Sequence, residues 1–278
     1  MPPVEQRQTI EIGLPESAVQ DVPKAFRNTA ATPILKLMKD STGMRGNILY
    51  FTDAMTLASD MNDGKIQIGI FQGHELAWAR TRYADLVPIA VAVPMNPVQT
   101  FLLVRADSKA KSIGDLANDK ISLPSYRPDF CEMFLAKQKQ EQLKDIDFAG
   151  QIDAATATDA IFDVIDGKAG CTVVDASTLK FFEAVQPGAY KNVRILCQSE
   201  VFPDACITVK KNDLDEKTIE QFRQTLLNVR NLPGGPPLLT ALKLKSFAKV
   251  PDDYEQSLKN IEKQYPMPAA EVKASARK

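Results

Sequence analysis

The sequence predicts an α/β protein of two lobes, joined by a hinge that the chain crosses twice. Strand-like and helix-like segments alternate along most of the 278 residues, and the alternation recurs in two blocks. A chain of this length also exceeds the usual size of a single hydrophobic core. Because each strand is followed closely by a helix, a largely parallel sheet is expected in each lobe.

The first block alternates strands with helices. Strands are predicted over residues 8–12, 47–51 and 65–71, where apolar and polar residues alternate. A helix is predicted to end after residues 34–38, at Thr42-Gly43, and a second helix, around residues 56–61, to end at Asp63-Gly64.

The rest of the chain repeats this order, with the second block over roughly residues 105–200. Strands are predicted over residues 100–104, 120–123, 171–174, 193–196 and 205–209. Ser112 and Asp115 have the spacing of a capping box, which predicts a short helix, and a longer helix over 159–165 is closed by Gly167. Residues 231–237 are rich in Pro and Gly and predict a loop between helices that begin near Asp215 and Asp252. The tail after Pro268 is expected to fray.

The two blocks indicate a discontinuous domain. Crossings near residues 104 and 204 assign 1–104 and 205–278 to lobe 1, and 105–204 to an inserted lobe 2. In such a fold, ligands bind at the loops that follow the carboxyl ends of the strands, so a solute is expected in the cleft between the lobes.

Composition excludes several function classes. Hydrophobic residues make up 44% and charged residues 25%, which is typical of a soluble globular protein. The formal net charge of −1 counts against nucleic acid and against anionic lipid as partners. No run of about 18 apolar residues is present, so we expect no membrane insertion. The N-terminal residues have no apolar core and do not resemble a secretory signal peptide.

Four cysteines leave two interpretations open. Cys131, Cys171, Cys197 and Cys206 do not have the Cys-x-x-Cys spacing of a structural zinc site, so no metal is expected. Cys197 and Cys206 lie on neighbouring strand-like runs and are compatible with a disulfide in an oxidising compartment. Free buried thiols are the alternative.

One family shares several motifs with the chain. Leu103-Val104-Arg105-Ala106-Asp107-Ser108, followed by Ile113-Gly114-Asp115-Leu116 and Lys120-Ile121-Ser122, resembles the V-R-A-D-S … I … D-L-K-G-K segment of phosphate/phosphonate-type periplasmic substrate-binding proteins of ABC transporters. Further stretches resemble the same family in the same order: 42–43, 64–69, 166–170, 199–204, 210–214 and 238–254. The resemblance covers nearly the whole chain.

The resemblance implies a type II periplasmic binding protein fold whose lobes close on a small, often anionic, phosphonate-like ligand. It implies transport rather than catalysis, with an ABC transporter permease as partner and no cofactor. It also implies a periplasmic or otherwise extracytoplasmic location, so a signal peptide is expected to be missing from this sequence.

The resemblance also places candidate ligand-binding residues. They follow predicted strands or open predicted helices, where backbone N–H groups can bind an anion. They are Ser17, Gln72, Gly73, His74, Gln99, Thr100, Thr158, Asp159 and Asp175. Structural roles are alternatives for each, since Thr158 is a natural helix N-cap and Asp175 could cap the following helix.

The loop after residue 123 departs from the family pattern. Family members place a Ser/Thr-Gly run here, whose N–H groups hold the anion, whereas this chain has Ser125-Tyr126-Arg127-Pro128. Pro128 has no N–H to donate. Arg127 could replace the lost donors with its guanidinium, or could be a surface residue paired with Asp129. The departure counts against a phosphonate, and Tyr126 favours a flatter organic solute.

Other functions have weaker support. The single histidine, His74, has no second histidine with which to bind a metal, and it could contact the ligand or pack against Trp78. No nucleophile elbow, dinucleotide fingerprint or P-loop is present, so the chain is not expected to be an enzyme. A pyrimidine-synthase-like enzyme on the same fold and a solute sensor that signals through a partner protein remain the alternatives.

Overall fold

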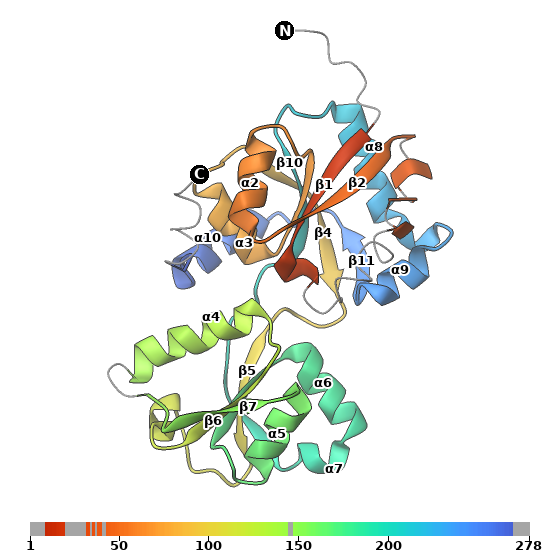
Figure 1. Cartoon of the computed structure of the whole chain (residues 1–278). Coiled ribbons are helices and arrows are strands. Elements are labelled where there is room, and N and C mark those ends of the chain that lie inside the picture. Colours follow the sequence, from red (N-terminus) through yellow and green to blue (C-terminus); the bar gives the residue numbers. More distant parts are fainter. Residues whose placement is uncertain are drawn as a thin grey trace. The chain divides into compact units, whose positions relative to one another are not determined.

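The computed structural model describes residues 9–19, 32–33, 35–36, 38–40, 43–143 and 147–268. The chain forms two compact units, which Figure 1 shows in one view. The first unit comprises Met1–Met95 and Pro203–Lys278, and the second comprises Asn96–Phe202. The predictions for Thr42 and for the tail after Pro268 lie outside the described residues.

The first crossing lies earlier in the chain than the sequence predicted. We predicted that residues up to 104 belong to the first lobe, but the structure assigns residues 96–104 to the second unit. The reason is strand pairing. β5 (Thr100–Arg105) lies between β8 (Cys171–Asp175) and β9 (Val193–Gln198) in the sheet of the second unit.

The first unit contains a six-stranded sheet in the order β11-β4-β10-β3-β1-β2. These strands are β1 (Thr9–Pro15), β2 (Arg45–Phe51), β3 (Ile68–Phe71), β4 (Leu86–Pro94), β10 (Ala205–Lys210) and β11 (Leu244–Ala248). β1 pairs in parallel with β2 and β3, whereas β10 is antiparallel to both β3 and β4. The sheet is therefore mixed, because β10 and β11 run antiparallel to the other strands of the largely parallel sheet that we predicted.

Helices cover both faces of this sheet. α2 (Ala54–Asn62), α3 (Gly73–Arg80) and α10 (Tyr254–Gln264) lie on one side, and α8 (Glu216–Leu227) and α9 (Gly235–Ala241) lie on the other (Figure 1). On the α8 side, Ile219, Phe222 and Leu226 lie at helical spacing and belong to one buried cluster with Ile10 and Ile12 of β1. Short 3₁₀ turns occur at η1 (Glu16–Val19) and η5 (Val229–Asn231).

The second unit contains a five-stranded sheet in the order β7-β6-β8-β5-β9. Its other strands are β6 (Lys120–Pro124) and β7 (Gly150–Ala154). β6 pairs in parallel with β7 and β8, and β5 runs antiparallel to its two neighbours. α5 (Ala157–Ile165) and α6 (Ala176–Val185) pack on one face through a core that includes Leu103, Ile161 and Phe182.

The remaining helices of the second unit are shorter or lie on the opposite face. They are η3 (Ile113–Leu116), α4 (Asp129–Gln138), the π-helical η4 (Lys139–Leu143) and α7 (Pro187–Tyr190). The predicted capping box of Ser112 and Asp115 is confirmed, because the Asp115 carboxylate accepts the Ser112 N–H at 3.0 Å.

Local predictions agree with the structure where a few neighbouring residues decide the conformation. Gly64 and Gly167 have φ angles of 74° and end α2 and α5 as expected. The loop prediction over 231–237 is wrong in part, because α9 begins at Gly235. Pro236 and Pro237 lie in its first turn, where a helix needs no N–H donor from them. β4, β7, β11 and α4 were not predicted.

All four cysteines are free thiols. The disulfide interpretation of Cys197 and Cys206 is therefore wrong, and the alternative of free thiols holds. Burial raises the pKa of Cys206 to about 11 and that of Cys171 to about 12, so both thiols stay protonated at neutral pH.

Candidate functional site

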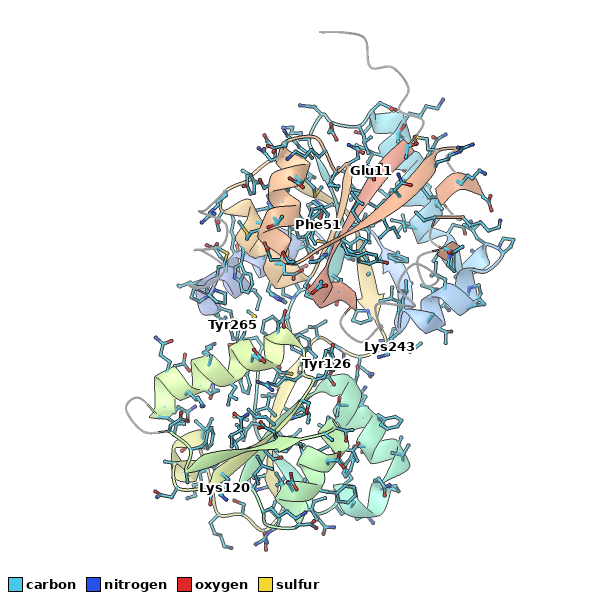
Figure 2. The ribbon with its side chains drawn as sticks, viewed as in Figure 1. Glu11, Phe51, Lys120, Tyr126, Lys243 and Tyr265 are labelled. Atoms are coloured by element: carbon cyan, nitrogen blue, oxygen red, sulfur yellow. The ribbon has the colours of Figure 1, made fainter. Side chains whose placement is uncertain are left out.

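Polar residues follow the ends of the parallel strands in the first unit. β1, β2 and β3 end at Pro15, Phe51 and Phe71, and these ends lie at one edge of the sheet. Ser17, Thr52-Asp53 and Gln72 lie within two residues of these ends, and together with Glu75 we call them the first-unit edge. Figure 2 labels Phe51 at the end of β2, away from Glu11 in the middle of β1. Two of the predicted site residues, Ser17 and Gln72, lie at this edge.

Glu75 links the segments of the first-unit edge. Its side chain is only 5% exposed and lies in the first turn of α3. One carboxylate oxygen accepts the Ser17 hydroxyl at 2.5 Å, and the other accepts the Gln72 N–H at 2.8 Å. The second bond forms half of a capping box in which Gln72 is the N-cap. The carboxylate therefore accepts an N–H group at the start of α3 and also holds η1 against this helix.

Gly73 and His74 are structural rather than open to a solute. A Cβ at Gly73 would lie 2.3 Å from the Pro203 carbonyl oxygen, so the chain entering β10 requires glycine here. His74 is 2% exposed, and its ring meets Trp78 edge-on at 5.1 Å between centroids. Of our two interpretations for His74, packing against Trp78 is the one that the structure supports.

In the second unit, the loop after β6 carries three of the predicted residues. Ser125 and Tyr126 are exposed, and Tyr126 retains 49% of its surface. Figure 2 shows Tyr126 at the opposite end of β6 from Lys120, the first residue of that strand. The Ser125 hydroxyl donates to the Ala154 carbonyl at 2.9 Å, which holds this loop against the end of β7.

Arg127 is held in place from two sides. Its Nη1 donates to the Pro124 carbonyl at 3.0 Å, and its Nη2 lies 2.9 Å from a Glu132 carboxylate oxygen. The ion pair thus involves Glu132, one turn beyond the Asp129 that we predicted. The Arg127 Nε is buried and makes no hydrogen bond to any residue that the structure describes. The guanidinium is therefore fixed beside the start of α4.

Gln99 and Thr100 make hydrogen bonds that support neighbouring segments of the second unit. The Gln99 amide donates to the Ser199 carbonyl at 2.8 Å, and its own backbone carbonyl accepts the Ala176 N–H. Thr100 is fully buried, and its hydroxyl lies 3.4 Å from both the Phe130 carbonyl and the Cys131 thiol. Burial counts against the predicted solute contact at Thr100.

The remaining predicted residues lie at the starts of α5 and α6. Asp175 is the N-cap of α6 and accepts the Thr178 N–H at 2.6 Å, as the structural alternative predicted. Asp159 accepts the Thr156 N–H and hydroxyl, at 3.0 and 2.8 Å, in a capping box. The N-cap of α5 is therefore Thr156, and our N-cap assignment to Thr158 is wrong: Thr158 lies within the first turn.

Thr52 and Asp53 were missed in the sequence. They follow β2 directly, and Asp53 caps α2 by accepting the Thr56 N–H at 2.7 Å. The signal was present as an Asp three residues before Thr56, directly after a predicted strand.

The family comparison decides the identity. The model of a family described as the periplasmic substrate-binding protein of ABC phosphonate transporters matches residues 24–254. The chain belongs to this family. The family is one of substrate-binding proteins and not of enzymes, which implies a small-molecule ligand and a permease as partner. No curated protein sequence matches the chain.

Solved structures share the fold of this phosphonate-family protein at low sequence identity. A Xanthomonas citri protein bound to ATP has a TM-score of 0.65 at 16% identity, covering 93% of this chain and 97% of that one. A binding component of a Pseudomonas aeruginosa ABC phosphonate transporter has a TM-score of 0.59 at 17% identity, with 97% and 94% covered. A Prochlorococcus marinus protein in complex with methylphosphonate has a TM-score of 0.63 at 12% identity, with 93% and 97% covered.

These likenesses confirm the predicted two-lobed type II fold. Within the described residues, the family member has no helix that is both long and apolar enough to cross a membrane.

We expect Gly73→Ala to destabilise the protein by about 1–3 kcal/mol, because the new methyl group would overlap the backbone at Pro203. Gly188→Ala is the matched control, since a Cβ at Gly188 in α7 has no neighbour within 4 Å. Chemical denaturation of both variants measures the difference. Equal free energies of unfolding for the two would show that residues 203 and 73 do not approach each other.

Because His74 is buried, we expect the free energy of unfolding to fall in mild acid. Burial lowers the pKa of His74 from 6.5 to about 4, so between these values the unfolded chain binds a proton that the folded chain does not. Stability contributed by neutral His74 is complete above pH 6.5 and is lost as the pH falls toward 4, by up to about 3 kcal/mol. His74→Phe or His74→Leu should flatten this part of the stability profile. An unchanged slope in both variants would contradict a buried neutral imidazole.

Proposed function

We propose that this chain binds a small organic solute with a compact anionic group, of the phosphonate class, outside the cytoplasm and presents it to an ABC transporter permease. Family membership supports the transport role, because the matching family comprises periplasmic substrate-binding proteins. The solute class is supported by the start of α4.

The start of α4 carries the proposal. The helices that follow the other parallel strands have side-chain caps: Asp53 caps α2, Glu75 completes the box of α3, Thr156 and Asp159 cap α5, and Asp175 caps α6. α4 begins after Pro128, and no side chain caps it. Uncapped N–H groups at a helix start, together with the helix dipole, favour an anion.

Arg127 adds a positive charge at the same place. Its Nη2 pairs with Glu132 in the first turn of α4, so the guanidinium neutralises an acidic residue at this helix start, which no side chain caps. Arginine forms charge-assisted hydrogen bonds with phosphonate and carboxylate oxygens. In this proposal, the Nη hydrogens of Arg127 that Pro124 and Glu132 do not use replace the donors of the missing Ser/Thr-Gly run. Exposed Tyr126 lies next to Arg127 for contact with the organic part of the solute.

The structural relatives favour phosphonates as the first solutes to test. One of them was solved with methylphosphonate, and its fold is the fold of this chain.

A thermal-shift screen over phosphonates, phosphate, phosphite, carboxylates and small amines tests the function. A solute that binds only the folded chain raises the unfolding temperature in a concentration-dependent way. We expect alkylphosphonates to do so. A shift with amines or neutral solutes alone would contradict the anion, and no shift with any member of the screen would contradict solute capture.

Arg127→Ala should weaken binding of the best anion roughly 10- to 100-fold, the usual cost of losing a charged hydrogen bond. The unfolding temperature without ligand should change little, since the ion pair with Glu132 is partly exposed. Arg105→Ala is the control. Arg105 ends β5, which runs antiparallel to β8, so its ion pair with Asp107 lies at the opposite end of the strands from Arg127. Isothermal titration measures the affinities, and a loss of stability as large as the loss of binding would make Arg127 structural.

A further inference from the structure

A bulge interrupts β4 near its start. Pro88 and Ala90 pair with consecutive residues of β10, so Ile89 between them is left without a partner in that strand. On the other side of β4, the pairs with β11 cover residues 91–94 and stop short of Ile89. Bulges occur often beside functional sites. The Ile89 carbonyl must therefore find its hydrogen-bond donor outside the sheet.

Arg223 of α8 supplies this donor. Its Nε donates to the Ile89 carbonyl at 3.1 Å, and its Nη1 donates to the Glu220 carboxylate one turn earlier in the helix. A guanidinium has five N–H hydrogens, so three remain, two of them on Nη2. The part of the chain that the structure describes offers Nη2 no hydrogen-bond partner. The backbone of β4 thus fixes a guanidinium that keeps donors available.

Arg223 lines a cavity of about 400 Å³, which lies among the start of β4, α8 and the residues after β11. This volume is within the range of small-molecule sites. All of the lining residues belong to the first unit. α8 covers the face of the sheet opposite to α3, and β10 separates β4 from β3, so the cavity is separate from the first-unit edge (Figure 1).

Two cations and one carboxylate line the cavity. The cations are Arg223 and Lys249, and Lys249 is exposed. The carboxylate is Glu220, which accepts the Gln224 amide at 2.6 Å. This hydrogen bond and the charges of Arg223 and Lys249 lower the pKa of Glu220, so it is ionised at neutral pH. The lining therefore has one positive charge in excess, which a ligand with a single negative charge would balance.

The rest of the wall is apolar. Pro88, Ile89 and Val250 line the cavity beside the charged groups. Ile89 is 4% exposed and belongs to the buried cluster between α8 and the sheet, so this wall is rigid. A fixed arginine matches the planar geometry of a carboxylate, whereas a dianion would be repelled by Glu220. The apolar wall suits a short hydrocarbon chain.

We propose that this cavity is a second binding site of the first unit, for a small monocarboxylate with a short hydrocarbon chain. Arg223 and Lys249 bind the carboxylate, and Pro88, Ile89 and Val250 contact the chain. The proposal is independent of the proposed function, which uses none of these residues.

Methyl NMR of the isoleucine- and valine-labelled chain tests the site at constant ionic strength. Acetate, butyrate and hexanoate should shift the Ile89 and Val250 signals in a saturable way, and leave Ile161 in the second unit unchanged. The Kd should fall about two- to fourfold for each methylene that enters the cavity. Butylamine and inorganic phosphate should give no saturable shift at these methyl groups.

Three results would overturn the inference. One is the absence of a saturable shift at Ile89 and Val250 with any of the carboxylates, which would leave Arg223 only the task of satisfying the Ile89 carbonyl. Another is a saturable shift confined to other methyl groups, which would place the carboxylate elsewhere. The third is binding of butylamine or phosphate as tight as that of butyrate, which would contradict the monocarboxylate.

Lys249→Glu should weaken butyrate binding about tenfold, because it replaces an attractive charge with a repulsive one. Lys249 is exposed, so the fold should be retained. Lys245→Glu is the matched control, since Lys245 is also exposed but lies near the start of β11 and outside the cavity lining. Butyrate should bind Lys245→Glu as it binds the unmodified chain. An equal loss in both variants would show a general charge effect and overturn the site.

Arg223→Lys keeps the charge and removes the planar fork. A lysine has one ammonium group for both the Ile89 carbonyl and the ligand, so butyrate binding should weaken about tenfold. An unchanged affinity would contradict the role assigned to Arg223. If this variant does not fold, because the Ile89 carbonyl has lost its donor, Lys249→Glu and its control carry the test.

Discussion

Each helix begins with N–H groups that have no partner inside the helix, and these groups must find acceptors. In this chain that requirement arranges most of the polar residues at the carboxyl ends of the strands. Asp53, Glu75, Asp159 and Asp175 each satisfy one helix start, and all four are acidic. The acceptors that hold the fold together therefore also determine the charge that a solute meets.

The two units satisfy this requirement differently. In the first unit, Glu75 and Asp53 supply the acceptors and also take the protons of Ser17 and Thr52. In the second unit, α4 starts without a side-chain cap, beside the guanidinium of Arg127. One edge therefore presents acceptors and the other presents donors.

Sequence patterns predicted the features that a few adjacent residues decide. The Ser112–Asp115 box and the left-handed turns at Gly64 and Gly167 depend on short-range geometry, and all three are present. The site could not be predicted in the same way. Ser17 and Glu75 meet across 58 positions of sequence, and the first crossing moved to residue 95 because β5 pairs with β8 and β9. His74 resembled a functional residue as the single histidine, but α10 and the sheet enclose α3 on both sides, so the ring is buried.

The chain contains one tryptophan, Trp78, and it lies in α3 of the first unit. Its indole N–H donates to the Tyr265 carbonyl at 2.8 Å, which joins α3 to the end of α10. Tryptophan emission therefore monitors the first unit alone, whereas circular dichroism monitors the helices and strands of both units. Unfolding curves from the two signals coincide only if the units lose structure in one cooperative step. The position of a single side chain thus makes the cooperativity between the units measurable without any label.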